Sequence, residues 1–394
     1  MSSTSQKPDS ASRNNPAMNS QQQSTSASPN NGTNSPESGP AKANRPSDSR
    51  FKQQKLKAWQ PILTAGTVLP TFFLIGLLFI PIGVVLYITS KNVQEHVFDY
   101  TDDCKSVNDH LTNIPCKDII KNETLAALLH GDACRCDIRI MIKEDVEKPV
   151  FIYYGLTNFY QNHRRYVKSR DDIQLLGDYS HTIPDCQPFQ ETNKTPIYPC
   201  GAVANSMFND TFVIRRENYH EGVRGQDEKV KILYTDIAWP SDRDKKFFNP
   251  KPELWPEVRR KTAKPPNWPN SVLDLSDDEN ENGVRNESFI VWMRTSALPT
   301  FRKLHSRIDH EQTDYTKGLP AGNYTIRIGY NYPVDAFDGR KRFIISNTSW
   351  AGGKNPFLGV AYIVVGSLCI LTGFIFLLIH MKFGKSLTEL ASVS

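Results

Sequence analysis

The chain has 394 residues and a net charge of +5, with a mean hydropathy of -0.47, and these averages describe a soluble and mildly basic protein. The positive charge is confined to one end, since residues 1–57 contain eight Lys or Arg and three Asp or Glu. A nucleic-acid-binding domain needs a folded basic face with interleaved aromatic residues. A basic tail is no argument for one, so we expect no nucleic-acid partner.

Residues 1–50 lack the side chains from which a core is built. They contain no Leu, Ile, Val, Phe, Tyr, Trp or Cys, and 13 of them are Ser. Such a segment cannot bury enough apolar surface to fold. We therefore predict a disordered cytosolic tail at 1–50, which continues into a basic juxtamembrane segment at 51–67.

The first of two long apolar segments follows the tail. No charged residue occurs from Trp59 to Ser90, and its most apolar part, Val68–Ile88, has 21 residues. As a helix this part is about 31 Å long, against roughly 30 Å for the hydrocarbon core of a membrane. We predict a transmembrane helix at 68–90, in preference to a buried core helix. The segment begins too far along the chain for a cleaved signal peptide, which indicates a retained signal anchor.

Flanking charges indicate the orientation of this helix. Basic residues precede it and acidic residues follow it: Arg45, Arg50, Lys52, Lys55 and Lys57 on one side, Glu95, Asp99, Asp102 and Asp103 on the other. The positive-inside rule then places the N-terminus in the cytosol. A second uncharged segment predicts a transmembrane helix at 355–380 and a cytosolic tail at 381–394, although Lys354 on its outer flank argues mildly against this. Residues 91–354 then form one lumenal or extracellular domain.

Cysteine usage supports an exported domain. Six of the seven Cys lie between the two apolar segments, at Cys104, Cys116, Cys134, Cys136, Cys186 and Cys200. An even set in an exported domain predicts three disulfides, for which 15 pairings are possible. A zinc site is the rival interpretation, but the pair Cys134 and Cys136 lacks the usual two-residue spacer, so we expect no metal. Six N-glycosylation sequons accompany the cysteines, at Asn122, Asn193, Asn209, Asn286, Asn323 and Asn347, and we expect three or four to be used.

Within this domain the patterns favour a mainly antiparallel β fold. One helix is predicted at Ile119–His130, and strands are predicted at Val150–Leu156, Phe289–Met293 and Tyr324–Tyr330. Pro, Lys and Trp are too frequent between Pro240 and Pro269 for long regular elements. The acidic run Asp274–Glu281 fits no calcium-loop spacing and is interpreted as a solvated loop.

Glycines recur at a helical spacing in both apolar segments. Gly352, Gly359, Gly366 and Gly373 are seven residues apart, and Gly76 and Gly83 repeat that spacing. Seven residues return to nearly the same helix face, and small residues allow helices to approach closely in lipid. We predict that this stripe docks the second span against another helix, the alternative being that Gly is simply common in spans.

A search for catalytic motifs finds none. The run Gly384-Lys385-Ser386 ends like a phosphate-binding loop, but Ile379 occupies the position where that motif requires its first Gly. The motifs Gly-x-Ser-x-Gly and His-Glu-x-x-His do not occur in the sequence. The cluster His163-Arg164-Arg165 could bind an anion, but a structural polar network is the commoner outcome. We expect no enzyme activity and no cofactor.

Several blocks of residues resemble the cell-division-cycle-fifty family. They occur in the family's order and spacing, at Phe51–Pro61, Tyr153–Tyr166, Ile197–Gly201, Asn205–Phe212, Val291–Thr295 and Leu319–Tyr324. Members of this family are the non-catalytic β-subunits of type-IV P-type ATPases, the phospholipid flippases. The resemblance covers roughly residues 51–380.

This resemblance implies a partner and a task. The partner would be the ATPase catalytic subunit in a membrane of phospholipids, and the chain would support its folding, its export from the endoplasmic reticulum to Golgi, endosome or plasma membrane, and its catalytic cycle. The glycine-striped second span would pack on an ATPase helix. The alternatives are a stand-alone two-span receptor or adhesion protein, and a lumenal hydrolase of unrecognised type.

The resemblance also implies particular residue roles. The disulfides would pair Cys104 with Cys136, Cys116 with Cys134, and Cys186 with Cys200. Asn209 is the sequon that we expect to be used first, because it lies inside a matching block.

Overall fold

A computed structural model describes residues 49–56, 64–220, 223–224 and 227–384. The predictions for the tail at 1–48, for 57–63 and for 385–394 therefore lie outside the described residues. The chain divides into two units, residues 1–62 and residues 63–394. In the first unit the described residues form a turn, in which Lys55 N donates to Arg50 O at 2.7 Å.

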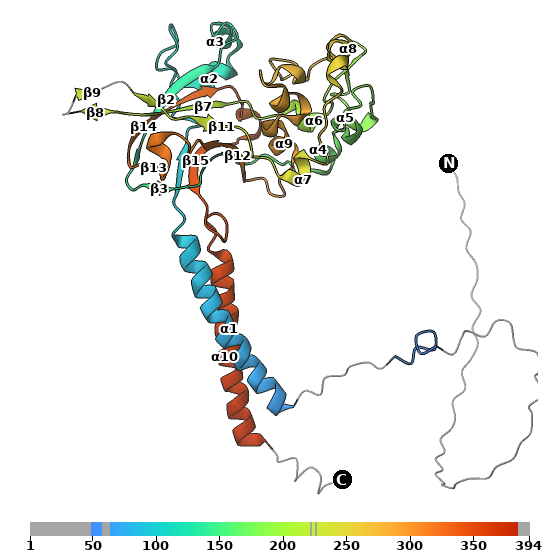
Figure 1. Cartoon of the computed structure of the whole chain (residues 1–394), viewed down its shortest axis with the longest axis vertical. Helices are drawn as coiled ribbons and strands as arrows, with labels where there is room; N and C mark the ends of the chain where they lie inside the picture. The colour runs from blue at the N-terminus through green and yellow to red at the C-terminus, as the bar shows by residue number, and fades with distance from the viewer. Residues whose placement is uncertain (1–48, 57–63, 221–222, 225–226, 385–394) are drawn as a thin grey trace, which may run out of the picture. The chain divides into compact units, whose positions relative to one another are not determined.

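Two long helices correspond to the two apolar segments. They are α1 (Ala65–Lys91) and α10 (Phe357–Phe383), each of 27 residues, or about 40 Å. Both are long and apolar enough to cross a membrane. They lie side by side (Figure 1), and their bounds differ by at most three residues from the predicted spans. The prediction of a two-span helical membrane protein is confirmed.

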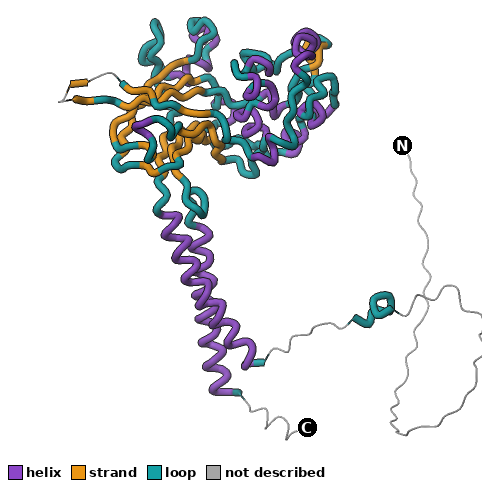
Figure 2. The backbone as a smooth tube through the Cα atoms, in the orientation of Figure 1, coloured by secondary structure: helices purple, strands orange, loops and turns teal. Residues whose placement is uncertain are grey.

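Antiparallel sheets make up the body of the domain between these helices (Figure 2). The five-stranded sheet has the order β1-β15-β4-β12-β11, with β1 Glu95–Asp99, β15 Lys341–Asn347, β4 Val150–Leu156, β12 Phe301–Ile308 and β11 Ile232–Leu233. The four-stranded sheet has the order β10-β7-β14-β2, with β10 Glu228–Lys229, β7 Thr211–Arg216, β14 Gly322–Tyr330 and β2 Cys134–Ile142. The short strands β13 Gly318–Leu319 and β3 Val146–Glu147 pair, as do β5 Glu191–Thr192 with β6 Thr195–Pro196 and β8 Tyr219–His220 with β9 Val223–Arg224.

The two large sheets share one aromatic core. Phe212 on β7 contacts Phe343 on β15, with ring centroids 4.9 Å apart, and His305 on β12 at 4.7 Å. Along β14 the apolar residues from Tyr324 to Tyr330 are almost fully buried, as their alternation predicts. The strands predicted at 150–156 and 324–330 are confirmed by β4 and β14, and with them the mainly antiparallel β domain.

The strand predicted at Phe289–Met293 is wrong, because these residues belong to the helix α9 (Glu287–Met293). Asn286 caps this helix, and its Oδ1 accepts a hydrogen bond from Phe289 N at 3.0 Å. A five-residue apolar run fits a buried helix as well as a buried strand. The Asn cap decides for the helix, because it satisfies a backbone N–H of the first turn.

The helix predicted at Ile119–His130 is divided in two, α2 (Cys116–Lys121) and α3 (Glu123–Ala127). Asn122 lies between them, and its Oδ1 accepts from the backbone N of Thr124 (3.0 Å) and Leu125 (3.3 Å). The prediction of one continuous helix is wrong here, because the Asn122 side chain competes with the helix backbone and starts a new helix.

Short helices fill the remaining loops at one end of the sheets (Figure 1). They are α4 Arg164–Lys168, α5 Asp172–Leu175, α6 Ala202–Asn205, α7 Pro240–Arg243 and α8 Trp255–Lys261, with 3-10 turns at Pro184–Cys186, Pro252–Leu254, Val272–Asp274, Glu279–Glu281, Gly283–Arg285, Thr313–Tyr315 and Asp335–Phe337. The absence of long elements between Pro240 and Pro269 agrees with the prediction.

Candidate functional site

The glycines of the two long helices lie at the contact between them. Gly76, Gly83, Gly359, Gly366 and Gly373 are all buried although the helices are otherwise largely exposed. A Cβ atom placed on Gly83 would lie 2.8 Å from the Ile363 backbone N and 2.9 Å from the Gly359 backbone O. Only Gly permits such an approach, so α1 and α10 touch through their backbones.

The glycine face of the second span lies against the first span of the same chain. Packing of the second span on an ATPase helix stays a prediction. Gly352 does not belong to the stripe. It precedes α10, has a φ of +104°, and has nothing within 4 Å of its Cβ position.

The two helices enter the β domain through neighbouring strands. β1 and β15 pair from Glu95 with Ser346 onwards. Just outside this pair Gln94 N donates to Asn347 Oδ1 at 2.9 Å, and at the helix ends Asn355 N donates to Ser90 Oγ at 2.8 Å. The helix pair is thus joined to the domain by two hydrogen-bonded links rather than by free linkers.

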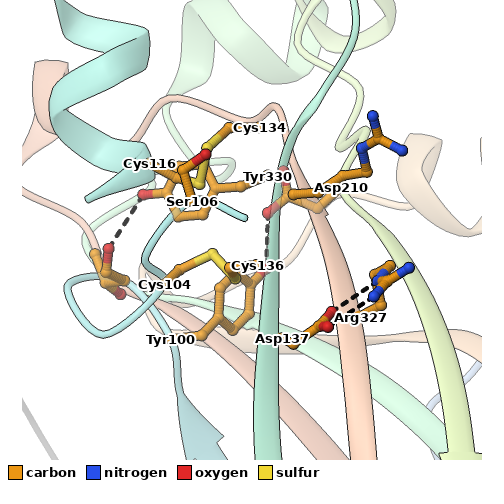
Figure 3. The surroundings of a disulfide bond; sticks show 12 residues. Tyr100, Cys104, Ser106, Cys116, Cys134, Cys136, Asp137, Asp210, Arg327 and Tyr330 are labelled. Atoms are coloured by element: carbon orange, nitrogen blue, oxygen red, sulfur yellow. Dashed lines mark hydrogen bonds and ion pairs between the residues drawn. A yellow bond between two sulfur atoms is a disulfide. The ribbon is translucent and has the colours of Figure 1, made fainter. Parts of the chain in front are cut away.

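Two disulfides lie next to each other at the start of β2 (Figure 3). They join Cys104 with Cys136 and Cys116 with Cys134, the pairs that the family resemblance implies. The one-residue spacer between Cys134 and Cys136 suits a strand, because alternate side chains point to the same face. A third bond, between Cys186 and Cys200, is buried in a small separate apolar cluster.

A buried ion pair that no sequence pattern predicts connects the two large sheets. Lys341 Nζ at the start of β15 lies 2.7 Å from Asp210 Oδ2 just before β7, and both side chains are fully buried. The carboxylate also accepts from Tyr100 OH at 2.7 Å and from the backbone N of Asn331 and Tyr332 at 2.6 Å each. We call Tyr100, Asp210 and Lys341 the buried triad.

Burial governs the titration of the buried triad. It lowers the pKa of Lys341 to about 8, although the charge of Asp210 opposes this shift. Burial, and then the negative charge of Asp210, raise the pKa of Tyr100 well above its ordinary value. No signal in the sequence marks these residues, since Asp210 lies inside a sequon and Lys341 in a basic run.

A second buried lysine holds the end of α9. Lys303 Nζ donates to the backbone oxygens of Val291 (3.0 Å), Trp292 (2.6 Å) and Arg294 (2.7 Å). Burial lowers its pKa well below the ordinary value for a lysine. Lys303 thus satisfies carbonyl groups that a helix C-terminus leaves without partners.

The basic cluster His163-Arg164-Arg165 is exposed at the start of α4. Exposure alone does not distinguish a structural polar network from an anion site, so both interpretations of this cluster stay predictions. Among the described residues, no group of three His, Cys, Asp or Glu is placed to hold a metal ion.

The sequons differ in exposure. Asn122, Asn193 and Asn323 are exposed, whereas Asn209 and Asn286 are half-buried and Asn347 is buried. The amide of Asn286 is engaged at both ends, because its Nδ2 also donates to Glu281 O at 3.0 Å.

The fold and these contacts define a class of protein: two closely packed membrane spans that carry a disulfide-bonded, antiparallel β domain. Residues 86–386 match the LEM3 (ligand-effect modulator 3) family / CDC50 family. The chain belongs to this family.

The chain is similar to several curated proteins, and each match covers most of both chains. Cell cycle control protein 50A of Mus musculus is 49% identical over 359 residues, which is 89% of this chain and 93% of the relative. Cell cycle control protein 50B of Homo sapiens is 45% identical over 356 residues, 86% of this chain and 95% of the relative. ALA-interacting subunit 3 of Arabidopsis thaliana is 36% identical over 340 residues, 86% of each chain.

Proposed function

We propose that this chain is the accessory β-subunit of a type-IV P-type ATPase that translocates phospholipids. Membership of the LEM3/CDC50 family over residues 86–386 carries this proposal. The name of one relative, ALA-interacting subunit 3, describes that protein as an interacting subunit. The chain would serve the folding of the ATPase, its export from the endoplasmic reticulum and its catalytic cycle. The ATPase would perform the chemistry.

The structure is suited to such a role in two respects. The spans are joined to each other through Gly83 and Gly359 and to the β domain through Gln94 and Asn347, so a partner in the membrane and a partner outside it would meet one connected body. The disulfides stabilise that body by restricting its unfolded chain.

Purification of the full-length chain in mild detergent from the cells that make it tests the proposal. We expect a P-type ATPase of type IV in equal amount, and we expect loss of the chain to hold that ATPase in the endoplasmic reticulum. A chain that purifies alone while its domain binds an extracellular ligand would instead support a receptor. An activity that is lost on mutation of His163 without loss of expression would support an enzyme.

We further propose that both termini lie in the cytosol and that residues 91–354 lie in the lumen or outside the cell. Glycosidase treatment followed by mass spectrometry tests this topology. We expect glycans within the domain, first at Asn209 and at the exposed Asn122, Asn193 and Asn323. Modification of residues 1–50 by an extracellular reagent on intact cells would contradict it.

A further inference from the structure

A short turn lies between the last strand of the β domain and the second span. In residues 349–352, Ser349 N donates to Gly352 O and Gly352 N donates to Ser349 O, both at 2.9 Å, and Ser349 Oγ donates to Gly352 O at 3.0 Å. Gly352 has a φ of +104°, which Gly adopts without strain. The turn is therefore closed on itself, and it presents Trp350 at its tip.

Trp350 is unusually exposed for its size. Its exposed fraction is 77%, which exceeds the 62% of Trp239, and Trp239 is also covered on one face by the Arg294 guanidinium, 4.4 Å from its ring centroid. A large aromatic side chain held in water loses the free energy of burial. A turn that is closed by its own hydrogen bonds and displays such a side chain favours an occupant that covers the ring.

The connections of the turn determine its depth relative to a membrane. It lies between Asn347, where β15 ends, and Phe357, where α10 begins, in the segment just above α10 in Figure 1. The corresponding link between α1 and β1 consists of only three residues, 92–94. The hydrogen bond between Asn355 N and Ser90 Oγ joins the link before α10 to the end of α1. The turn can therefore not move far from the end of the helix pair.

Helix length places that end in the headgroup layer. Each helix of 27 residues is about 40 Å long, which exceeds the roughly 30 Å hydrocarbon core but matches the 40–45 Å of a bilayer with its headgroups. Trp side chains favour this layer, because they have an apolar body and a polar N–H. Lys91 ends α1 and Lys354 follows the turn, and both are exposed. Their charges suit lipid phosphates in this layer.

We propose that the turn at 349–352 is a lipid-binding anchor, in which the Trp350 indole inserts into the headgroup layer on the β-domain side of the membrane. Its ligand is the phospholipid surface itself. The inference rests on the two spans and the turn, and it does not depend on the proposed ATPase partner.

Depth-dependent fluorescence quenching of the full chain in phosphatidylcholine vesicles tests the anchor. Trp350→Phe removes one of six tryptophans, so the difference in emission between wild type and variant isolates Trp350. We expect a nitroxide on the lipid headgroup to quench this component more strongly than a nitroxide at the end of the acyl chain. Trp239→Phe is the matched control, and we expect its component to be quenched by neither lipid.

Two results would overturn the anchor. One is a Trp350 component that neither lipid quenches, which would place the indole in water or against protein. The other is stronger quenching from the bilayer centre than from the headgroup. Trp350→Tyr provides a second variant that retains an interfacial side chain, and an unchanged thermal midpoint establishes that both variants are folded.

Discussion

A charged pair connects the two sheets in addition to their shared aromatic core. Asp210 and Lys341 are buried together, and a buried ion pair is stabilising only when its partners and hydrogen bonds are complete. Here the carboxylate has Tyr100 and two backbone N–H groups in addition to the lysine. The pair therefore acts as a unit, and the loss of one member leaves an uncompensated charge inside the core.

Asp210→Asn removes the charge while it keeps an oxygen acceptor and the Asn209 sequon. We expect the free energy of unfolding to fall by about 3–5 kcal/mol, because Lys341 is left buried without a counter-ion. Chemical denaturation of the purified chain measures this loss. The control is Asp137→Asn, which breaks the partly exposed pair with Arg327 and should lose no more than about 1 kcal/mol. Equal losses would contradict the special role of the buried triad.

His305 makes the stability of the β domain depend on pH. The residue is 9% exposed, and burial lowers its pKa to about 4. The unfolded chain binds a proton at the ordinary pKa of about 6.5 while the folded chain does not. The stabilisation of the folded domain by neutral His305 is therefore fully present above the pKa of the unfolded chain, and it is lost as the pH falls toward 4.

At about pH 5.5 this group alone should lower the free energy of unfolding by about 1.4 kcal/mol relative to pH 7.5. Denaturant unfolding at the two pH values measures the change. In His305→Gln the difference between the two values should be smaller by the same amount, since Gln does not titrate. An unchanged pH dependence in the variant would show that His305 has the same pKa in the folded and the unfolded chain, which would contradict the prediction.

At the scale of elements, the contact between α1 and α10 depends on backbone approach at glycine. Gly83→Leu would place a side chain against the backbone of Ile363 and Gly359. We expect a loss of about 1–3 kcal/mol, as for overpacking in a core, and a lower thermal midpoint in detergent. Gly66→Leu is the matched control on the same helix, because the nearest neighbour of its Cβ position is Thr64 Oγ1 at 4.0 Å. Equal midpoints for the two variants would sink this interpretation.

The sequence predicts the long elements well and the short ones poorly. The spans and the strands at 150–156 and 324–330 follow from length and periodicity, which many residues specify together. The segment at 289–293 has too few residues to show a period, and its helix depends on the cap at Asn286. The cap is a single residue, and Asn286 is also the Asn of a glycosylation sequon, so the sequence alone does not reveal its role in starting the helix.

The candidate sites show the same limit. Cysteine count and family resemblance imply the disulfide pairs, and the seven-residue spacing identifies the packing glycines. The partner of those glycines could not be predicted, because spacing describes one helix face and not what covers it. The buried triad has no sequence signal either, since burial of Lys341 results from strands far apart in the chain.

At the scale of the whole molecule, the Cys186–Cys200 bond supports a region separate from the main core. The double substitution Cys186→Ser and Cys200→Ser should lower the free energy of unfolding by about 3 kcal/mol, because the bond closes a loop of about 15 residues. Thermal unfolding of the detergent-solubilised chain measures the loss. Cys369→Ser, at the free cysteine of α10, is the control and should leave the midpoint unchanged. A double variant as stable as this control would contradict the prediction.

The pairing of β1 with β15 also has a consequence for biosynthesis. Glu95 and Ser346 are partners although roughly 250 residues separate them, and a ribosome adds about 5–20 residues per second. For about 12–50 s the first strand of the domain therefore exists without its neighbour, and its open edge is exposed to wrong partners. Completion of this sheet reports that the chain has been synthesised almost to its second span, so a quality-control system that senses the open edge would distinguish finished molecules from unfinished ones.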